Sequence, residues 1–363
     1  MTTTRLDVDM NNNKSSITLS SILTLAIALF SSFSVTSKEY KTILIHGFQP
    51  SQLMNAAGTD VVADGAGYWS SYWDQLADER IDWPSYERIE GKIASDWIWP
   101  KLQEFSRSDL CASGCVFVTH STGDLVARYI IDNQENWLRN AGLKPLNIIA
   151  TFDIAGAGGG SELADLAVSA LAGTASWNPL VDKALEWWLG NEVEDALGVL
   201  YDLKVNNARN IASFPDDRAP RLRFVADGDD FFGATSLFIR GNDDGVVATH
   251  SSCGASRVDA FGSCSTSIDT DGRLKQQNDA VTGFMAYHYP MLMTDNYSHN
   301  NIRESKHRGE VTVAIGRANV GGNLVSYNTN DKTTGAWFWK KHYRYVNQSD
   351  RLSASALIYN AIP

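Results

Sequence analysis

The hydrophobic positions of this chain fall into short apolar runs separated by longer stretches with a helical period. Four runs predict buried strands, at residues 40–45, 114–118, 146–152 and 221–225. After Gly123, apolar residues recur at Leu125, Val126, Tyr129 and Ile130, the spacing of one helix face. Strands that alternate with helices predict an α/β fold, with a mainly parallel central sheet and helices on both faces.

The first 37 residues have the pattern of an export signal. Lys14 precedes a moderately apolar stretch at residues 17–35, and small residues follow at Val35, Thr36 and Ser37. Several hydroxyl side chains interrupt the apolar run, which disfavours a stable membrane span. We therefore expect residues 1–37 to be a cleavable signal peptide, and the protein to be secreted or periplasmic.

The charge and cysteine content of the chain limit the classes of partner it could bind and the compartment in which it could reside. The net charge is −11 and no basic run occurs, so nucleic acid is excluded as an expected partner. The four cysteines form two local pairs, Cys111 with Cys115 and Cys253 with Cys264. Four cysteines allow three connectivities, of which we expect the local one, in an oxidising compartment.

The strongest chemical motif is the run from Val118 to Arg128, which lies between a predicted strand and a predicted helix. A tight turn between such elements exposes a serine hydroxyl, here that of Ser121. Gly123 leaves room for the close approach of strand and helix. Thr119 stands where the usual motif has Gly. The helix start directs its N–H groups toward Ser121 and favours developing negative charge there.

This run, HSTGDLVARY, resembles the nucleophile elbow of bacterial lipases and esterases of the α/β-hydrolase fold, which commonly reads HSMGGLVAR. The likeness is to Pseudomonas-type triacylglycerol lipases in particular. It implies an α/β-hydrolase fold with a helical lid or cap, and a carboxylic-ester hydrolase with Ser121 as nucleophile. Asp124 stands where those lipases have Gly.

The same resemblance implies an oxyanion hole. In this family one N–H donor belongs to the residue after the nucleophile, which is Thr122 here. The other follows an HG pair after an early strand. The run Ile45-His46-Gly47-Phe48 is similar to that loop, so Phe48 is the expected second donor.

The acid and the base should follow Ser121 in that order. Residues 241–247, GNDDGVV, resemble the family's NDGLV segment and assign the acid to Asp244, with Asp243 as the near alternative. Weaker alternatives are Asp227, Asp229 and Asp230. The run DNYSHN, at residues 295–300, is similar to the family's DNYRMNH, although its histidine comes two residues earlier. We expect His299 to be the base, with His288 packed in a strand and His307 solvated.

Residues 38–308 are the expected catalytic domain, and a helical lid or cap interrupts it at about 162–212. Six apolar residues there suit a lipid interface, or would pack on the sheet: Leu180, Val181, Leu185, Trp187, Trp188 and Leu189. Residues 309–363 are an expected β-rich extension of unknown role. Their aromatic and basic run at 337–341 could contact a membrane, although internal aromatic packing is the simpler interpretation.

The expected substrate is a lipid or a small ester, and no cofactor is required. A nicotinamide site is excluded, because Ser161 occupies the last glycine position of the only candidate loop. Related lipases bind calcium. Asp269 and Asp271 could hold such a cation here, although an ordinary polar turn is the simpler interpretation. Two other functions remain open: an acyltransferase with the same triad, and a catalytically inactive binding protein of this fold.

Overall fold

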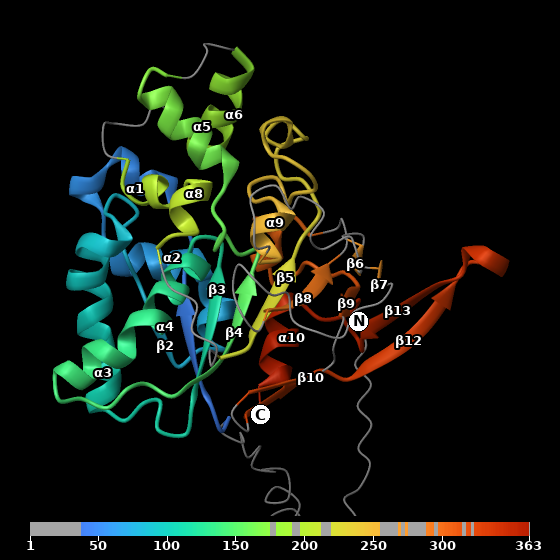
Figure 1. Ribbon diagram of the computed structural model, residues 1–363, viewed down its shortest axis with the longest axis horizontal. Helices are drawn as coiled ribbons and strands as arrows, with labels where there is room; N and C mark the ends of the chain where they lie inside the picture. Colours follow the sequence, from blue (N-terminus) through green and yellow to red (C-terminus); the bar gives the residue numbers. More distant parts are fainter. Residues whose placement is uncertain are drawn as a thin grey trace, which may run out of the picture. The chain divides into compact units, whose positions relative to one another are not determined.

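A nine-stranded sheet, in the order β12-β13-β9-β8-β5-β4-β3-β1-β2, organises the chain (Figure 1). The computed structural model describes residues 38–174, 179–190, 197–211, 219–254, 268–269, 273–274, 288–293, 297–313, 317–320 and 323–362. The neighbours from β8 to β2 pair in parallel. The strands of the sheet are β1 Lys41–Ile45, β2 Glu79–Ile81, β3 Cys115–His120, β4 Ile148–Ile154, β5 Arg221–Val225, β8 His288–Met293, β9 Val311–Val313, β12 Thr329–Thr334 and β13 Lys341–Val346.

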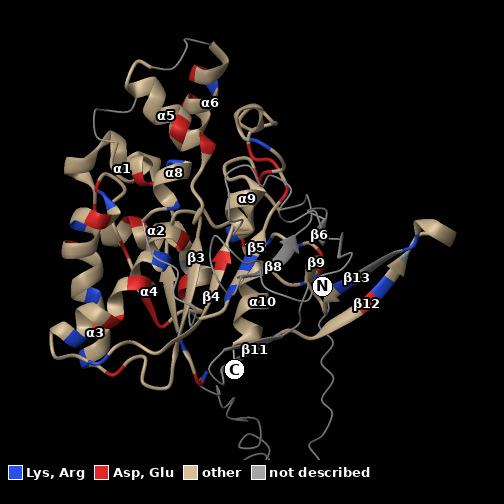
Figure 2. Cartoon of the chain, in the orientation of Figure 1, with Lys and Arg blue, Asp and Glu red and all other residues tan. Residues whose placement is uncertain are grey.

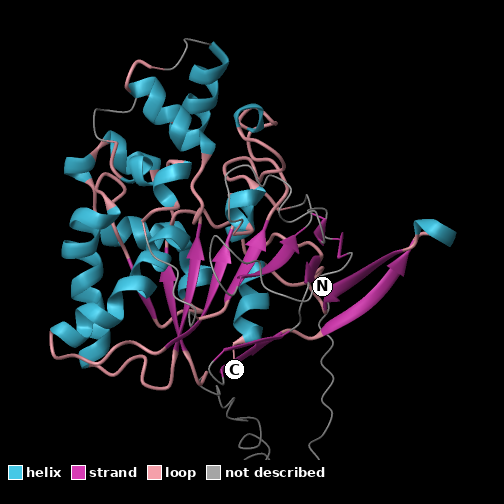
Figure 3. Cartoon of the chain, viewed as in Figure 1, coloured by secondary structure: helices cyan, strands magenta, loops and turns pink. Residues whose placement is uncertain are grey.

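Helices lie on both sides of this sheet (Figure 3). The larger ones are α2 Val61–Asp74, α3 Trp99–Arg107, α4 Gly123–Asn140, α5 Glu162–Leu171, α6 Pro179–Leu189 and α10 Ala354–Ala361. Shorter helices are α1 Pro50–Met54, α7 Val199–Asp202, α8 Val205–Ala208 and α9 Thr249–Ser252, with η1 Ala56–Gly58, η2 Ile89–Ile98, η3 Ser236–Phe238, η4 Asn301–Arg303 and η5 Trp337–Trp339. Two small hairpins are β6 Ile268–Asp269 with β7 Arg273–Leu274, and β10 Arg317–Val320 with β11 Asn323–Ser326.

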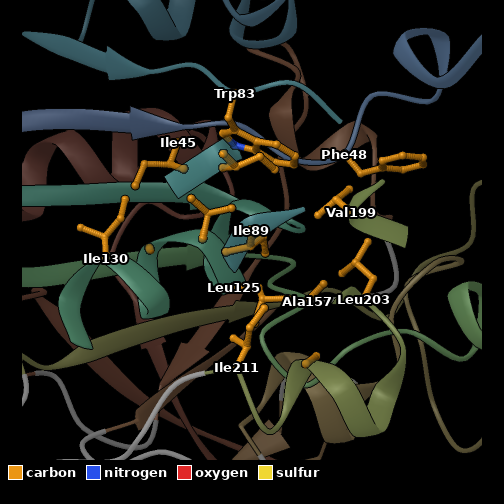
Figure 4. Packing of buried hydrophobic residues seen from close by; sticks show 14 of the residues in the cluster. Ile45, Phe48, Trp83, Ile89, Leu125, Ile130, Ala157, Val199, Leu203 and Ile211 are labelled. Atoms are coloured by element: carbon orange, nitrogen blue, oxygen red, sulfur yellow. The ribbon is translucent and has the colours of Figure 1, made fainter. Parts of the chain in front are cut away.

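Side chains alternate along each strand, so the sheet has a hydrophobic core on each face. On one face, Ile45 packs in a buried cluster with Leu125 and Ile130 of α4 (Figure 4). On the other face, Leu44 belongs to a cluster that includes Trp73 of α2 and Leu357 of α10. A mainly parallel sheet that is covered on both faces confirms the expected α/β fold.

The insertion between β4 and β5 is helical, with α5, α6, α7 and α8 among its described residues. Its apolar residues divide between the two expected roles. Val181 and Leu189 are buried, and Leu185 and Trp188 pack against the core. Leu180 and Trp187 are 59% and 39% exposed, so some apolar side chains of the described part of the insertion face solvent.

The residues after 309 extend the sheet. β9 pairs antiparallel with β8, β13 pairs with β9, and β12 pairs with β13. The hairpin of β12 and β13 projects away from the helices and carries η5 at its end (Figure 1). There the side chains of Trp337, Phe338 and Trp339 are 84%, 80% and 71% exposed, so the expectation that they pack internally is wrong. We call these three residues the aromatic tip.

Cys111 and Cys115 form the expected disulfide. Cys264 lies outside the described residues, so its pairing with Cys253 stays a prediction. Residues 1–37, the predicted signal peptide, also lie outside them. Among the helices that the structure describes, none has the length and apolar character needed to span a membrane.

Candidate active site

Ser121 occupies the sharp turn between β3, which ends at His120, and α4, which begins at Gly123. Its φ is +55°, a left-handed conformation that is rare for a residue with a side chain. A Cβ atom at Gly123 would lie 2.2 Å from the carbonyl oxygen of Ile45. Only glycine therefore allows α4 to approach β1 this closely, which explains the glycine two residues after the serine.

The structure brings together the three residues that the sequence singled out. His299 Nε2 lies 2.9 Å from Ser121 Oγ, and His299 Nδ1 lies 2.9 Å from Asp244 Oδ2. All three side chains are buried. They come from turns that follow β3, β5 and β8 in the chain, and the arrowheads of β3 and β5 point to the same edge of the sheet (Figure 1). That edge is where parallel α/β sheets place their ligand sites.

Asp244 is held as an acceptor for the histidine. Its Oδ1 accepts the backbone N–H groups of Val246 and Val247, at 3.1 and 2.8 Å. Its carbonyl oxygen accepts the backbone N–H of His299. Oδ2 is thereby directed at the imidazole. Since a carboxylate can only accept, Nδ1 carries a proton and Nε2 is free to accept the hydroxyl proton of Ser121.

The alternative acids lie elsewhere in the site. Asp243 Oδ1 accepts from Ser236 Oγ and from the N–H of Gly245, and burial raises the pKa of Asp243 to about 6. Asp230 flanks His299, because its carboxylate accepts from the hydroxyl of Ser298 and from the N–H of Asn300. Asp230 thus fixes the segment on which His299 lies.

Phe48 and Thr122, the expected oxyanion donors, both line the pocket that contains Ser121. Within the described part of the chain, neither backbone N–H has a hydrogen-bond partner. Ser121 contributes its own N–H to the carbonyl of Ile154, at 3.0 Å. The N–H groups of Phe48 and Thr122, which the sequence assigned to the oxyanion hole, are therefore available to a ligand in this pocket.

His46 fixes the loop that carries Phe48. Its Nδ1 donates to the carbonyl oxygen of Gly47 at 2.8 Å, and its Nε2 accepts the N–H of Trp83 at 3.1 Å. The ring stacks on Trp83 with centroids 4.8 Å apart. Burial lowers the pKa of His46 to about 4, so the ring stays neutral and both hydrogen bonds persist at neutral pH.

His120 and Tyr68 support the base, and sequence reasoning missed both roles. His120 Nε2 donates to the carbonyl oxygen of His299 at 2.8 Å, and the Tyr68 hydroxyl donates to Nδ1 of the same ring. Burial, and then the nearby His299 and Arg303, hold the pKa of His120 well below its ordinary value. His120 was visible beside Ser121 in the motif. Tyr68 lies 52 residues before His120 in the chain, and no sequence pattern indicated its role.

A buried network of four charges lies behind the elbow. Asp124 Oδ1 accepts from Arg221 at 2.6 Å, and its Oδ2 accepts from Arg223 at 2.6 Å. Asp153 accepts from Arg221 Nε at 2.9 Å and from the hydroxyl of Thr119, also at 2.9 Å. Figure 2 shows the basic positions of β5 beside the acidic position of β4.

This network explains both departures from the usual elbow motif. Thr119 stands where the motif has glycine, and its hydroxyl donates a hydrogen bond to Asp153. Asp124 also stands where the motif has glycine, and its carboxylate pairs with the buried Arg221 and Arg223. Arg223 also donates to the carbonyl oxygens of Ser251 and Ser252 in α9, the helix that follows the Asp244 turn. The charges therefore tie the serine turn to the element that follows the acid.

The pocket at Ser121 has a volume of about 260 Å³. Much of its wall is apolar, formed by Phe48, Ala157, Trp188, Leu203, Phe231, Val246 and Val247. Among the described residues, no group of three or more His, Cys, Asp or Glu side chains could hold a metal ion. Asp271, part of the candidate calcium turn, lies outside the described residues.

Comparison with known proteins gives likenesses of structure alone. No protein-family model matches the chain. No curated protein matches it either. Solved structures that resemble it include the mature form of a lipase from Bacillus licheniformis, at 18% identity and a TM-score of 0.39, covering 60% of this chain and 80% of that one.

Two further solved structures resemble this chain with similarly low sequence identities and TM-scores. A lipase from Staphylococcus hyicus is 11% identical with a TM-score of 0.40, and the alignment covers 74% of this chain and 89% of that one. A metagenomic carboxyl esterase is 15% identical with a TM-score of 0.37, over 59% of this chain and 60% of that one. Because the identities are this low, the chemistry of the site is argued below from its own atoms.

The charge network predicts a large stability effect for Asp124→Asn. The amide leaves Arg221 and Arg223 with one buried carboxylate, and removing one partner of a buried ion pair costs about 3–5 kcal/mol. Burial opposes the charge of Asp124, but Arg223 and Arg221 outweigh it and lower its pKa. The stabilisation that ionised Asp124 gives to the folded state is therefore complete above about pH 4 and is lost as the pH falls further.

Urea unfolding at pH 7 measures this difference. Glu135→Gln is the matched control, because Glu135 lies on the exposed side of α4 and pairs with Arg139 at the surface. We expect the control to change the free energy of unfolding by less than about 0.5 kcal/mol. Equal effects of the two substitutions would show that the buried charges do not hold the elbow in place.

Proposed function

We propose that this protein is a serine hydrolase that cleaves carboxylic esters through an acyl-enzyme. The observation that carries the proposal is the hydrogen-bonded series from Ser121 through His299 to Asp244, with both distances at 2.9 Å. A serine hydroxyl is a poor nucleophile unless an adjacent base removes its proton. Here the base contacts the hydroxyl, and a third group orients the base.

In the proposed reaction, Ser121 Oγ attacks the ester carbonyl carbon while its proton moves to His299 Nε2. The carbonyl oxygen becomes an oxyanion and accepts the N–H groups of Phe48 and Thr122. The intermediate then expels the alcohol, which takes the proton from Nε2. Water repeats the sequence on the acyl-enzyme and releases the acid. Asp244 keeps its negative charge throughout and stabilises the protonated imidazole.

The pocket wall supports an apolar acyl group. The rings of Phe48 and Trp188 lie 5.8 Å apart, and both border the pocket next to Ser121. Trp188 belongs to α6, so the helical insertion contributes to the wall of the proposed acyl site. Apolar lining with a few directed polar groups is the usual character of a site for a small organic substrate.

The proposal includes export and contact with a lipid interface. The signal-like residues 1–37 support secretion or a periplasmic location, and the disulfide of Cys111 with Cys115 suits an oxidising compartment. The aromatic tip supports contact with lipid, because tryptophan favours the boundary between headgroups and acyl chains. Lys340 and Lys341 follow the tip directly and complement anionic headgroups.

Asp244→Asn and Asp243→Asn test the assignment of the acid. The amide at position 244 favours the wrong imidazole tautomer, and such a change lowers kcat by roughly 10⁴-fold in a serine triad. The amide oxygen introduced at position 243 can still accept from Ser236 and Gly245, so we expect the kcat of Asp243→Asn to stay close to that of the wild type. Steady-state hydrolysis of a short-chain ester measures both variants, with Ser121→Ala as the inactive reference. Equal losses at the two positions would contradict the assignment.

The aromatic tip has its own test. We expect the variant Trp337→Ala, Phe338→Ala, Trp339→Ala to lose about tenfold or more in binding to vesicles of phosphatidylcholine mixed with phosphatidylglycerol, because it loses the interfacial rings. Cosedimentation measures the binding. Phe232→Ala, at a fully exposed aromatic outside the hairpin, is the control and should bind as the wild type does. Unchanged binding of the triple variant would exclude the tip as the membrane contact.

A further inference from the structure

A second pocket adjoins the pocket at Ser121, and the two share Tyr68, Asn300 and Arg303. We call it the outer pocket. Its volume is about 460 Å³. Most of the side chains that line it can form hydrogen bonds or carry a charge, and they include Ser70, Asn300, Arg303, Glu304, Ser305 and Lys306. A substrate that extends from one pocket into the other would therefore place an apolar part and a polar part on either side of the shared residues.

Arg303 holds a fixed position in the wall between these pockets. Its guanidinium carbon lies 4.0 Å from the centre of the Tyr68 ring, and its Nη1 donates to the carbonyl oxygen of Tyr68 at 2.6 Å. Its Nε is buried and has no hydrogen-bond partner among the described residues. The stacking and the backbone contact orient the planar group, and neither of them supplies a negatively charged partner.

No aspartate or glutamate of the described residues forms an ion pair with Arg303. The adjacent Glu304 pairs instead with Lys306, at 3.4 Å. The buried arginines near the elbow, Arg221 and Arg223, differ in this respect, because each contacts carboxylates directly. An oriented arginine in a pocket wall, without a counter-ion from the described part of the chain, suits a ligand that supplies a carboxylate or a phosphate.

The position of Arg303 indicates which part of a substrate it would meet. It lies on η4, four residues after His299 in the chain, and both residues line the pocket at Ser121. In a serine triad the histidine gives its proton to the leaving group, so the leaving group lies on the histidine side of the nucleophile. The outer pocket, which contains Asn300 directly after His299, extends from that side.

We propose that the natural substrate is an ester whose alcohol part carries an anionic group, and that Arg303 binds this group in the outer pocket. This inference rests on the proposed ester hydrolysis. The apolar acyl chain occupies the pocket near Phe48 and Trp188, and the anionic alcohol leaves past Arg303. A carboxylate and a phosphate offer the same paired oxygen acceptors to a guanidinium, so both are candidates for the anion.

Two matched pairs of esters test the inference and separate the two anions. The first pair is the butyrate ester of 4-hydroxybenzoate and that of its methyl ester. The second is 1-butyrylglycerol 3-phosphate and 1-butyrylglycerol. Within each pair the acyl group is identical and the anion is the main difference. The measured quantity is the ratio of kcat/KM for the anionic ester to kcat/KM for the neutral one.

We expect the wild type to favour at least one anionic ester by about tenfold or more, the effect of one charge-assisted hydrogen bond. Arg303→Gln should bring the ratio close to one, mainly through a higher KM. Arg303→Lys should retain part of the preference, because it keeps the charge and loses the planar fork. Lys92→Gln is the control for net charge, since Lys92 is an exposed residue of η2 that pairs with Glu87.

A wild-type ratio near one in both pairs would overturn the inference even if the Arg303 variants failed to fold. An anionic preference that survives in folded Arg303→Gln would also overturn it. Hydrolysis of the neutral esters in either case would leave the proposed ester hydrolysis intact. Failure of the wild type to cleave any of the four esters would instead contradict the proposed function itself, and this inference with it.

Discussion

The left-handed backbone of Ser121 is the constraint on which the site depends. It reverses the chain between β3 and α4 within two residues and directs the hydroxyl out of the sheet. The turn requires a residue without a side chain at Gly123, because the carbonyl oxygen of Ile45 occupies the space that a Cβ would need. It also leaves the N–H of Thr122, beside the hydroxyl, without a partner among the described residues. Strain, close packing and the expected oxyanion donor therefore arise from one short segment.

The charges behind this turn act as its support. Asp124 lies in the first turn of α4, three residues after the strained Ser121, and its two arginines both belong to β5. Such a cluster is expensive to bury, and it is stable only when each member is paired and hydrogen-bonded. Because Arg223 also contacts the carbonyl groups of α9, any shift of the serine turn relative to the acid turn would disrupt these contacts. A network of this kind favours one arrangement of the two turns over nearby alternatives.

Much of the fold could be predicted from the sequence, because the apolar runs and the helical period are local signals. The strand at Arg221–Val225 has the predicted limits, and the expected elbow lies between β3 and α4. The motifs around Ser121, Asp244 and His299 likewise located the residues that the structure brings into contact. The roles of Thr119 and Asp124 could not be derived, since their partners Asp153 and Arg221 are 34 and 97 residues away. Tyr68 and Arg303 were missed for the same reason: their importance lies in a contact between residues 235 positions apart in the chain.

The most direct test of the central claim is reaction with a fluorophosphonate, followed by mass spectrometry of the intact protein and of its peptides. An activated serine attacks the phosphorus and keeps the phosphonyl group, whereas an ordinary hydroxyl does not react at neutral pH. The account predicts one adduct per chain, on the peptide that contains Ser121, and its loss in both Ser121→Ala and His299→Ala. A folded wild-type protein that forms no adduct, or forms it on another residue, would contradict the claim that Ser121 is an activated nucleophile.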